Sequence, residues 1–397
     1  MRKGKEKTKA YYFSRGNILP LGWLIGRHTP EPELDNKSPI EVLEKYIETK
    51  TWTAVTGPRL VGKTTFTRSI ARHLEQGGYI EVYVNVAGIK DFPSFVLKTY
   101  QKLPNSTKLE VRREYGDVTV KLGISAKGGY GEVGKNLEHP KNTIKSYASI
   151  VLDFMLKHLP DGSILIWDEV QDLGEKNIAT LLSSLWRVYN EIEDDEKRPE
   201  ILVTGSSVRL LRLFLEPAEE GYEDQWFVGR EFENILLRPW DRDTFENYVY
   251  AGFEYYDVPI TLREVEWLWE YSHGLPGITV LYGYGRCVRK LSHKKVVNTI
   301  RKSQLAKIRD EIFRLIEFEF PKAAPRLQKA LKLFAQGKSI NEIIKSSKTS
   351  RDSFYGMLRL LEKNGYLIKD SEFEGRGEKE YHFAAKIYED AIKSWRI

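Results

Sequence analysis

At 397 residues the chain is too long for one ordinary hydrophobic core, and its 41% hydrophobic and 30% charged residues are typical of a soluble globular protein of two to three domains. No apolar run approaches the length of a membrane span, and the basic N-terminus lacks the apolar segment of a secretion signal, so we expect neither a membrane anchor nor secretion. The single cysteine, Cys287, excludes an internal disulfide and favours a reducing cytoplasm, and the net charge of +6 keeps nucleic acid among the candidate partners.

Residues 1–20 form a basic N-terminal arm. The arm has five Lys and Arg residues near its start: Arg2, Lys3, Lys5, Lys7 and Lys9. Such an arm either contacts phosphate groups or is a solvated tail, and the sequence leaves both open. Few Cys and Met residues beside many Lys and Glu residues are typical of a thermophilic source.

The most informative stretch is the glycine loop, residues 57–64, which reads GPRLVGKT and satisfies the pattern G-x-x-x-x-G-K-[ST]. Residues 51–55 before it are typical of a short β-strand. Residues 64–75 after it are typical of a helix with one apolar face. A strand, a glycine loop and a helix N-terminus together direct backbone N–H groups and a positive dipole at one point, where a triphosphate fits.

Several residues of this stretch are therefore predicted to bind ATP or ADP. They are Gly57, Pro58, Arg59, Val61, Gly62, Lys63, Thr64 and Thr65. The Lys63 ammonium would neutralise the outer phosphates, and the Thr64 hydroxyl would be a ligand of the accompanying Mg²⁺.

A second strand, residues 163–167, ends in the two acids Asp168 and Glu169. A short apolar run of this kind is typical of a buried parallel strand that delivers acids to the sheet edge where ligands bind. We expect Asp168 to hold Mg²⁺ through water. Glu169 would orient or deprotonate the attacking water.

A third buried strand, residues 201–204, ends in hydroxyl groups. Thr204 or Ser206 would lie near the γ-phosphate as a polar sensor, or the strand simply ends in a turn; both interpretations remain open. Helical patterns at 91–103, 143–159 and 177–192 alternate with the strands. This alternation predicts an α/β fold, with a parallel sheet and helices on both faces.

Residues 129–136 match the loop pattern up to the last position, where Asn136 lacks the hydroxyl that a metal needs. Pro140 would also break the helix that should follow. The apolar residues Val118, Val120 and Leu122 alternate with polar ones, which favours a half-exposed strand. We therefore expect a β-hairpin over 117–136, inside a β-rich insertion of residues 104–142, and no second nucleotide site.

The C-terminal segment, residues 322–397, contains 16 Lys and Arg against 10 Asp and Glu, so the basic excess of the chain lies here. Three helical patterns followed by two short strands predict a winged helix. The third helix would read a DNA major groove. Its candidate contacts, with one from the wing, are Arg351, Ser353, Tyr355, Arg359 and Arg376. The alternative is that this segment packs on the rest of the chain or on a protein partner.

Six stretches carry a family resemblance: residues 24–27 (LIGR), 57–64, 166–171 (IWDEVQ), 204–207 (TGSS), 229–230 (GR) and 273–276 (HGLP). In this order they resemble the archaeal ATPase family. That family belongs to the STAND branch of the AAA+-related P-loop NTPases and is more distantly similar to origin-recognition ATPases. The resemblance implies a P-loop ATPase core over 21–238, a helical lid over 239–321 and a winged-helix domain over 322–397.

The resemblance also implies roles for residues outside the glycine loop. Ile25, Gly26 and Arg27 would lie against the adenine, and Arg230 would act as an arginine finger or sensor on the γ-phosphate. Pro276 would lie where the lid contacts the base, although Gly274 and Pro276 equally fit a plain helix end. Arg286 is a further candidate sensor. The chain departs from the family pattern at Leu60, where many members repeat an arginine, and in the length of its insertion.

Together these features predict an ATP-binding and ATP-hydrolysing switch that uses Mg²⁺ and couples its nucleotide state to double-stranded DNA, to self-association or to a protein partner. One alternative is a DNA-binding regulator whose ATP site is mainly structural. The other is a signalling ATPase whose winged helix docks protein. The paired acids Asp168 and Glu169 favour hydrolysis, because a site kept only for binding needs no residue that activates water.

Overall fold

The computed structural model describes residues 12–13, 19, 24–126, 141–192, 194, 197–205, 232–369 and 381–395. The chain divides into two compact units. Ile18–Thr56 and Lys63–Leu236 form the first, which we call the sheet unit. Met1–Asn17, Gly57–Gly62 and Leu237–Ile397 form the second, the helical unit. Each is described by itself.

The sheet unit is built on a five-stranded parallel sheet with the strand order β2-β3-β4-β1-β5. The strands are β1 (Trp52–Thr56), β2 (Ile80–Asn85), β3 (Ser163–Asp168), β4 (Glu200–Thr204) and β5 (Phe232–Leu236). The three central strands, β1, β3 and β4, are buried along their whole length. Apolar runs such as Ile164–Trp167 form such strands because helices cover both faces of the sheet.

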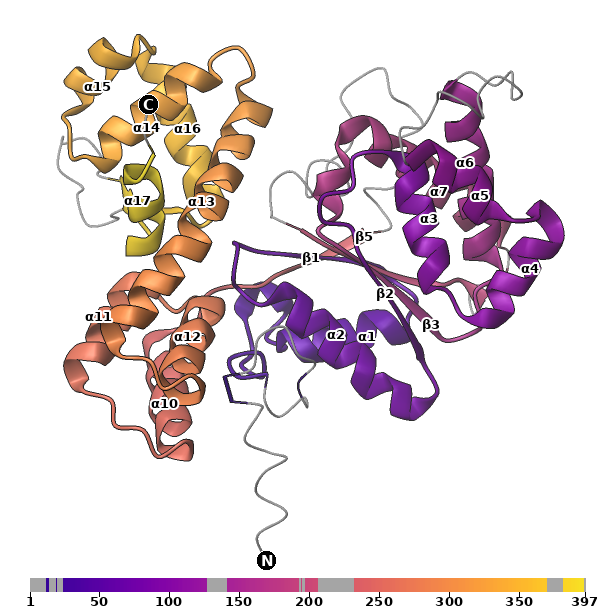
Figure 1. Cartoon of the computed structure of the whole chain (residues 1–397), viewed down its shortest axis with the longest axis horizontal. Helices are drawn as coiled ribbons and strands as arrows, with labels where there is room; N and C mark the ends of the chain where they lie inside the picture. Colours follow the sequence, from indigo (N-terminus) through magenta and orange to yellow (C-terminus); the bar gives the residue numbers. More distant parts are fainter. Residues whose placement is uncertain are drawn as a thin grey trace, which may run out of the picture. The chain divides into compact units, whose positions relative to one another are not determined.

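Helices lie on both faces of this sheet (Figure 1). One face is covered by α1 (Pro39–Glu48) and α2 (Lys63–Leu74), and the other by α3 (Phe92–Lys102), α6 (Lys141–Lys157) and α7 (Glu175–Glu191). Short turns are η2 (Pro32–Leu34), η3 (Glu75–Gly77) and η4 (Val170–Leu173). The parallel α/β architecture predicted from the sequence is confirmed.

The predicted β-hairpin over 117–136 is wrong. The insertion is helical where the structure describes it, with α4 (Asn105–Tyr115) and α5 (Val118–Ala126), and the glycine tip lies outside the described residues. Val118 and Leu122 are both fully buried and lie one helical turn apart, whereas Val120 is exposed. A strand would place all three residues on one face, whereas a helix places Val118 and Leu122 on the core side and Val120 away from it, as the burial of these side chains shows.

The helical unit begins with α10 (Arg242–Tyr255), α11 (Leu262–Ser272), α12 (Pro276–Gly283) and the π-helical turn η7 (Tyr284–Val288). Thr261 and Glu264 form a reciprocal capping box at the start of α11. Gly274 follows the helix with φ +73°, and a Cβ there would lie 2.0 Å from the carbonyl oxygen of Trp240. Only glycine fits this helix end.

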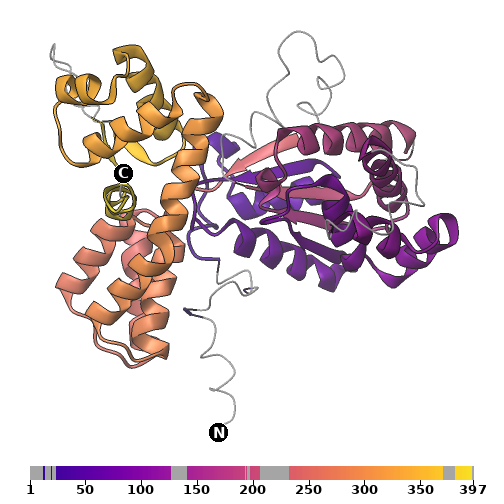
Figure 2. The ribbon, with the colours of Figure 1, turned by 45° about the horizontal axis from the view of Figure 1, so that its top comes forward.

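The long helix α13 (His293–Glu319) runs from these helices to the C-terminal segment (Figure 2). The C-terminal segment consists of α14 (Ala324–Ala335), α15 (Ile340–Ser347), α16 (Arg351–Lys363), β6 (Leu367–Lys369), β7 (Tyr381–Phe383) and α17 (Lys386–Lys393). β6 and β7 pair antiparallel. Within the part of the chain that the structure describes, no helix combines the length and the apolar character that a bilayer span requires.

The N-terminal arm is anchored at Phe13 in the helical unit. The Phe13 ring is buried, stacks on Tyr256 and packs edge-on against Phe253. A Cβ on Gly252 or Gly283 would collide with this ring, so the two glycines make room for it. The sequence suggested no such anchor for the arm.

Glu200, at the start of β4, is a buried carboxyl group that yields a prediction about stability. Among the described residues neither of its carboxylate oxygens has a hydrogen-bond partner. Burial raises the pKa of the carboxyl well above its ordinary value, and the charge of Lys50 opposes this only in part. The contribution of Glu200 to stability is therefore most favourable below its unfolded pKa of about 4.3, and this contribution is lost as pH rises from there toward the folded pKa.

Replacing Glu200 with glutamine should remove this pH dependence, which amounts to at most about 1.4 kcal/mol per pH unit between the two pKa values. The Tm of Glu200→Gln should fall less than that of wild type between pH 5 and pH 8 in thermal unfolding followed by circular dichroism. Glu48→Gln, a change of the same kind at an exposed position of α1, should track wild type. Parallel curves for Glu200→Gln and wild type would contradict the prediction.

Candidate functional site

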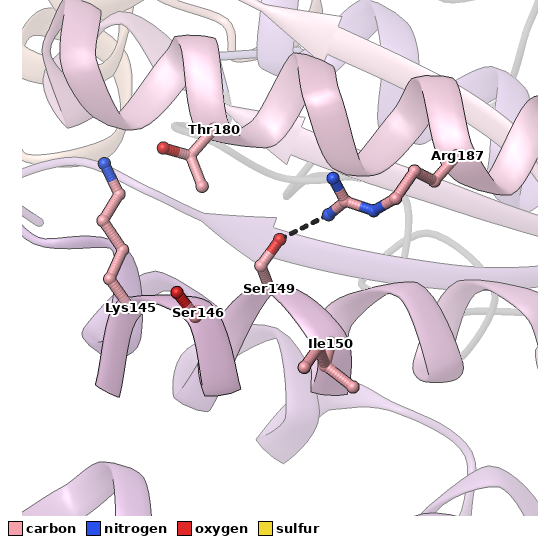
Figure 3. A pocket seen from close by; sticks show the side chains of 6 residues that line it. All are labelled: Lys145, Ser146, Ser149, Ile150, Thr180 and Arg187. Atoms are coloured by element: carbon pink, nitrogen blue, oxygen red, sulfur yellow. Dashed lines mark hydrogen bonds between the residues drawn. The ribbon is translucent and has the colours of Figure 1, made fainter. Parts of the chain in front are cut away.

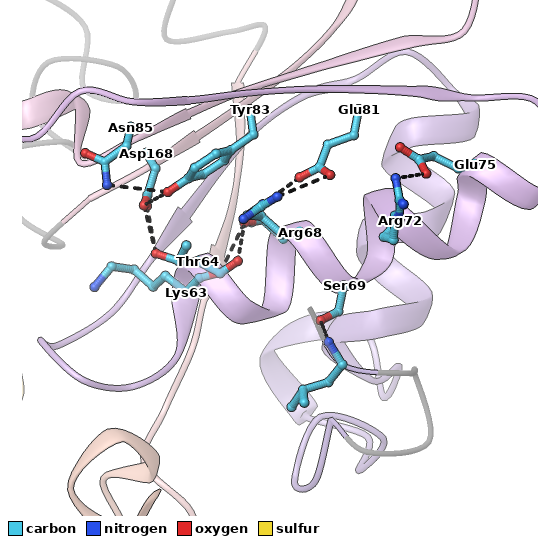
Figure 4. Close-up of polar contacts among 12 residues, drawn as sticks. Lys63, Thr64, Arg68, Ser69, Arg72, Glu75, Glu81, Tyr83, Asn85 and Asp168 are labelled. Carbon is cyan, nitrogen blue, oxygen red and sulfur yellow. Dashed lines mark hydrogen bonds and ion pairs between the residues drawn. The ribbon is translucent and has the colours of Figure 1, made fainter. Parts of the chain in front are cut away.

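Three hydroxyl groups converge on the Asp168 carboxylate in the sheet unit, and Figure 4 shows two of them, those of Thr64 and Tyr83. The Thr64 hydroxyl lies 2.9 and 3.0 Å from the two carboxylate oxygens. The Tyr83 hydroxyl donates at 2.7 Å, and the Thr204 hydroxyl donates to Oδ1. Asp168 is only 3% exposed, and a buried carboxylate is stable when donors of this kind satisfy its oxygens.

The parallel sheet explains why these groups meet. Asp168 is the last residue of β3 and pairs in register with Asn85, the last residue of β2. Thr204 ends the neighbouring strand β4, and Thr64 is the second residue of α2. The carboxyl ends of parallel strands share one sheet edge, and α2 is connected to β1 by the glycine loop, so the groups gather where the fold places ligands.

Tyr83 was missed by the sequence reasoning. Burial and the Asp168 charge raise the pKa of its hydroxyl, so the group stays protonated and donates. The Arg68 guanidinium lies 4.1 Å from the centre of the Tyr83 ring and forms a 2.6 Å ion pair with Glu81. Arg68, on α2, thus contacts the side chains of both Glu81 and Tyr83 on β2 (Figure 4). The alternation of Glu81, Tyr83 and Asn85 along β2 was the only signal in the sequence.

Glu169 has an unusual backbone. Its φ and ψ are 60° and 39°, in the left-handed region, which costs a non-glycine residue about 1 kcal/mol or more. Its N–H donates to the Thr204 hydroxyl at 3.4 Å, and the Gln171 side chain donates to its carboxylate. Strain of this kind gathers at functional sites. Thr204 therefore contacts the carboxylate of Asp168 and the backbone of Glu169. A contact between Thr204 and a γ-phosphate stays a prediction.

The glycine loop has the backbone that its sequence demands. Gly57 and Gly62 have φ values of +142° and +98°, and Leu60 also has a positive φ. A Cβ on Gly57 would lie 2.4 Å from the carbonyl oxygen of Leu237, so only glycine fits there. Lys63 is buried and begins α2, which places a cation at a helix N-terminus. This combination suits an anion with several phosphate groups.

Near Pro276, where the sequence predicted a contact between the lid and the nucleotide, the structure has a contact between α12 and the glycine loop. Pro276 begins α12, and the N–H of the next residue, Gly277, donates to the Leu60 carbonyl at 2.7 Å. A Cβ on Gly277 would lie 2.8 Å from Leu60 atoms. The start of α12 therefore packs directly on the glycine loop. Contact of Pro276 with a nucleotide base stays a prediction.

The donor set fits Mg²⁺ better than a metal held by protein alone. Among the described residues no group of three or more His, Cys, Asp and Glu side chains could enclose a metal ion. Mg²⁺ usually takes one or two carboxylates, waters and substrate phosphates. One carboxylate at Asp168 beside one hydroxyl at Thr64 matches that pattern.

The segment expected against the adenine forms a tight turn in the sheet unit. Ile25 and Gly26 lie inside it, and the N–H of Arg27 donates to the Leu24 carbonyl at 3.0 Å. Arg27 is buried, and burial lowers its pKa to about 10, so the side chain stays charged at neutral pH. The adenine contact stays a prediction.

The remaining candidate residues lie apart from the Asp168 cluster or outside the residues that the structure describes. Ser206, Arg230 and Arg376 are outside the described residues. Arg286 forms an ion pair with Glu264 and donates to the Tyr282 hydroxyl at 2.9 Å. Its charge is therefore already compensated inside the helical unit.

The candidate DNA contacts on α16 differ in their surroundings. Arg351 and Arg359 are exposed. The Ser353 hydroxyl lies 2.8 Å from the Ser350 hydroxyl at the helix N-cap. Tyr355 lines a cavity of about 1250 Å³ together with residues of α11, α14 and β7. Of these four residues, the two arginines have the most exposed side chains.

A smaller cavity, of about 450 Å³, lies between α6 and α7 (Figure 3). It is lined by Lys145, Ser146, Ser149, Ile150, Thr180 and Arg187. Arg187 donates to Ser149 at 2.6 Å and forms a 2.6 Å ion pair with Asp153. A carboxylate thus already balances the guanidinium, and no predicted site residue lines this cavity.

Comparison with known proteins gives a family and a fold. The model of an ATPase domain that occurs predominantly in Archaea matches residues 34–281. A Walker-type ATPase of Pyrococcus abyssi is similar in structure, with a TM-score of 0.61 and 18% identity, over 96% of this chain and 99% of that one. At this identity the likeness shows the fold alone. No curated protein matches the chain.

Two other solved structures are less similar. Cdc6p from Pyrobaculum aerophilum has a TM-score of 0.42 and 11% identity, over 97% of this chain and 98% of that one. The RuvB Holliday junction branch migration motor of Thermotoga maritima has a TM-score of 0.41 and 14% identity, over 91% of this chain and 94% of that one. These scores are too low to carry an argument.

The Tyr83 hydroxyl gives a prediction for metal binding. Tyr83→Phe should weaken the apparent affinity for Mg²⁺ in the presence of ATP by about tenfold, the usual effect of losing a group that orients a metal-binding carboxylate. A Mg²⁺ titration of nucleotide binding measures it. Tyr79→Phe, a change of the same kind just before β2, serves as the control. An unchanged Mg²⁺ midpoint in Tyr83→Phe would show that this hydroxyl does not position Asp168.

Proposed function

The chain belongs to the family of ATPase domains that occur predominantly in Archaea, and we propose that it binds Mg·ATP at the glycine loop and hydrolyses it to ADP and phosphate. The observation that carries the proposal is the Thr64 hydroxyl within 3.0 Å of both oxygens of a buried Asp168 carboxylate. The loop motif and the acidic strand, more than 100 positions apart, meet at one point. The predicted membership of the archaeal ATPase family is confirmed.

Each residue of the site has a separate role in the proposed reaction. Lys63 and the start of α2 offset the charge of the phosphates. Thr64 would bind Mg²⁺ directly and Asp168 would bind it through water, and the ion would draw charge from the phosphate oxygens. Glu169 would orient the attacking water and accept its proton, with its position fixed by Gln171 and Thr204.

Two variants separate binding from hydrolysis. Lys63→Ala should abolish detectable ATP binding, because it removes the cation that offsets the phosphates. Glu169→Gln should bind ATP like wild type but hydrolyse it about 100-fold more slowly or worse, the scale for losing a general base. Calorimetric titration and phosphate release measure the two effects. Wild-type binding by Lys63→Ala would contradict the site, and wild-type turnover by Glu169→Gln would contradict the assignment of the base.

The finer role that we propose is that of a STAND-like switch whose nucleotide state controls binding of double-stranded DNA by a winged helix in the C-terminal segment. The element order of three helices, a two-stranded antiparallel sheet and exposed Arg351 and Arg359 on the third helix supports it. The basic excess of this segment adds non-specific attraction to phosphates. The alternative occupant is a protein partner, including a second copy of the chain.

Duplex binding tests this finer role. Arg351→Ala and Arg359→Ala should each weaken binding to double-stranded DNA severalfold without changing ATP affinity, and the salt dependence of binding should become shallower. Fluorescence anisotropy at about 0.1 M salt is the measurement, since long-range surface attraction is already partly screened there. Arg289→Ala, which removes one exposed charge after η7, is the matched control. Absence of duplex binding by wild type would favour a protein partner.

A further inference from the structure

The glycine loop is joined to the long helix α13 by an ion pair. Arg59 Nη1 lies 3.3 Å from Glu311 Oε2, and the two side chains are 30% and 17% exposed. Both residues belong to the helical unit, although 252 positions separate them in the chain. The partial burial of the pair strengthens it relative to a pair on the open surface.

The second oxygen of the same carboxylate is bound from the C-terminal segment. The Tyr366 hydroxyl donates to Glu311 Oε1 at 2.9 Å. Tyr366 is only 2% exposed and directly precedes β6. Burial and the Glu311 charge raise the pKa of this hydroxyl, so it stays a protonated donor. One carboxylate therefore holds a loop residue with one oxygen and the C-terminal segment with the other.

One N–H group of the Arg59 guanidinium lacks a hydrogen bond to any of the described residues in this arrangement. Its Nε–H is buried and has no hydrogen-bond partner among the residues that the structure describes. A buried donor without an acceptor is unfavourable, and a phosphate oxygen would be a strongly charged acceptor. Arg59 lies in the loop that the proposed function assigns to the phosphates, so Glu311 and a bound triphosphate would be competing acceptors for one guanidinium.

We propose that Glu311 is a positioning residue that withholds Arg59 from the nucleotide, and that it couples ATP affinity to the seating of the C-terminal segment through Tyr366. This inference rests on the proposed function. Coupling is reciprocal: if the intact Arg59–Glu311 pair weakens ATP binding, bound ATP must weaken the pair by the same factor. Release of Arg59 removes one of the two groups that hold the Glu311 carboxylate in place, so the carboxylate can turn away and loosen its hydrogen bond to Tyr366.

The rest of the loop does not depend on this pair. The Leu60 carbonyl is bound by the Gly277 N–H at 2.7 Å, and Gly57 packs on the Leu237 carbonyl. Both are backbone contacts within the helical unit. The pair can therefore be removed while the loop keeps its conformation.

The first test is the affinity for ATP and ADP of the full chain, measured by calorimetric titration with Mg²⁺ present. Glu311→Gln should bind ATP about fivefold more tightly or better, within the usual range of coupling between sites. It should change ADP affinity less, because ADP lacks the outer phosphate. Arg59→Gln should remove this gain when combined with Glu311→Gln. Asp310→Asn is the matched control, because Asp310 is half-exposed on the same helix and pairs with its neighbour Arg309.

The second test follows the C-terminal segment by amide hydrogen exchange. In wild type, Mg·ATP should speed exchange at the β6–β7 pair, where the Ala384 N–H donates to the Tyr366 carbonyl. In Glu311→Gln this exchange should be fast without nucleotide, and ATP should not speed it further. Tyr366→Phe keeps the ring but removes the hydrogen bond that orients the Glu311 carboxylate toward Arg59, so it should raise exchange at the same amides and give a smaller gain in ATP affinity.

The results separate the inference from the proposed function. Wild type and Lys63→Ala with equal ATP affinity would remove the proposed function and with it the inference. If wild type binds ATP, an affinity of folded Glu311→Gln within twofold of wild type, or weaker, would overturn the inference alone. Should Glu311→Gln fail to fold, Tyr366→Phe decides: unchanged exchange and unchanged ATP affinity in that variant would overturn it.

Discussion

The site depends on one buried negative charge, the Asp168 carboxylate. An ion taken out of water is stable only where donors replace its hydration, and here the hydroxyls of Thr64, Tyr83 and Thr204 do so. They come from α2, β2 and β4, so the charge fixes the relative positions of three elements. Glu169, held by the same Thr204, is positioned as a consequence. The Asp168 carboxylate is therefore central both to the packing of this sheet edge and to the chemistry proposed for it.

The glycine loop is held by a different set of contacts. Its first six residues, Gly57–Gly62, belong by their contacts to the helical unit, and Lys63 begins the helix that belongs to the sheet unit. Backbone contacts at Gly57 and Leu60 and the Arg59 ion pair hold that first part. The glycine loop therefore belongs to both units, with six residues in the helical unit and Lys63 and Thr64 in the sheet unit.

The sequence predicted well what short motifs determine. The parallel sheet follows from local patterns whose physical meaning does not depend on distant residues, and the same patterns marked the loop and the acids Asp168 and Glu169, whose roles toward a nucleotide stay predictions. Tyr83 could not be found in this way, because its role depends on the register between β2 and β3. The Arg59–Glu311 pair was hidden for the same reason, since only the folded chain brings these residues together. The insertion was misread because alternation at Val118, Val120 and Leu122 contains an i,i+4 pair, and the helix used that pair.

The central claim is that the Asp168 carboxylate organises a Mg²⁺-dependent ATPase site. Phosphate release from ATP, measured for wild type and Asp168→Asn over a Mg²⁺ titration, tests it most directly, because asparagine keeps the shape of the side chain and removes its charge. The account predicts Mg²⁺-dependent turnover by wild type and a loss of about 100-fold or more in the variant at every Mg²⁺ concentration. Equal turnover with the same Mg²⁺ dependence in both proteins would contradict it.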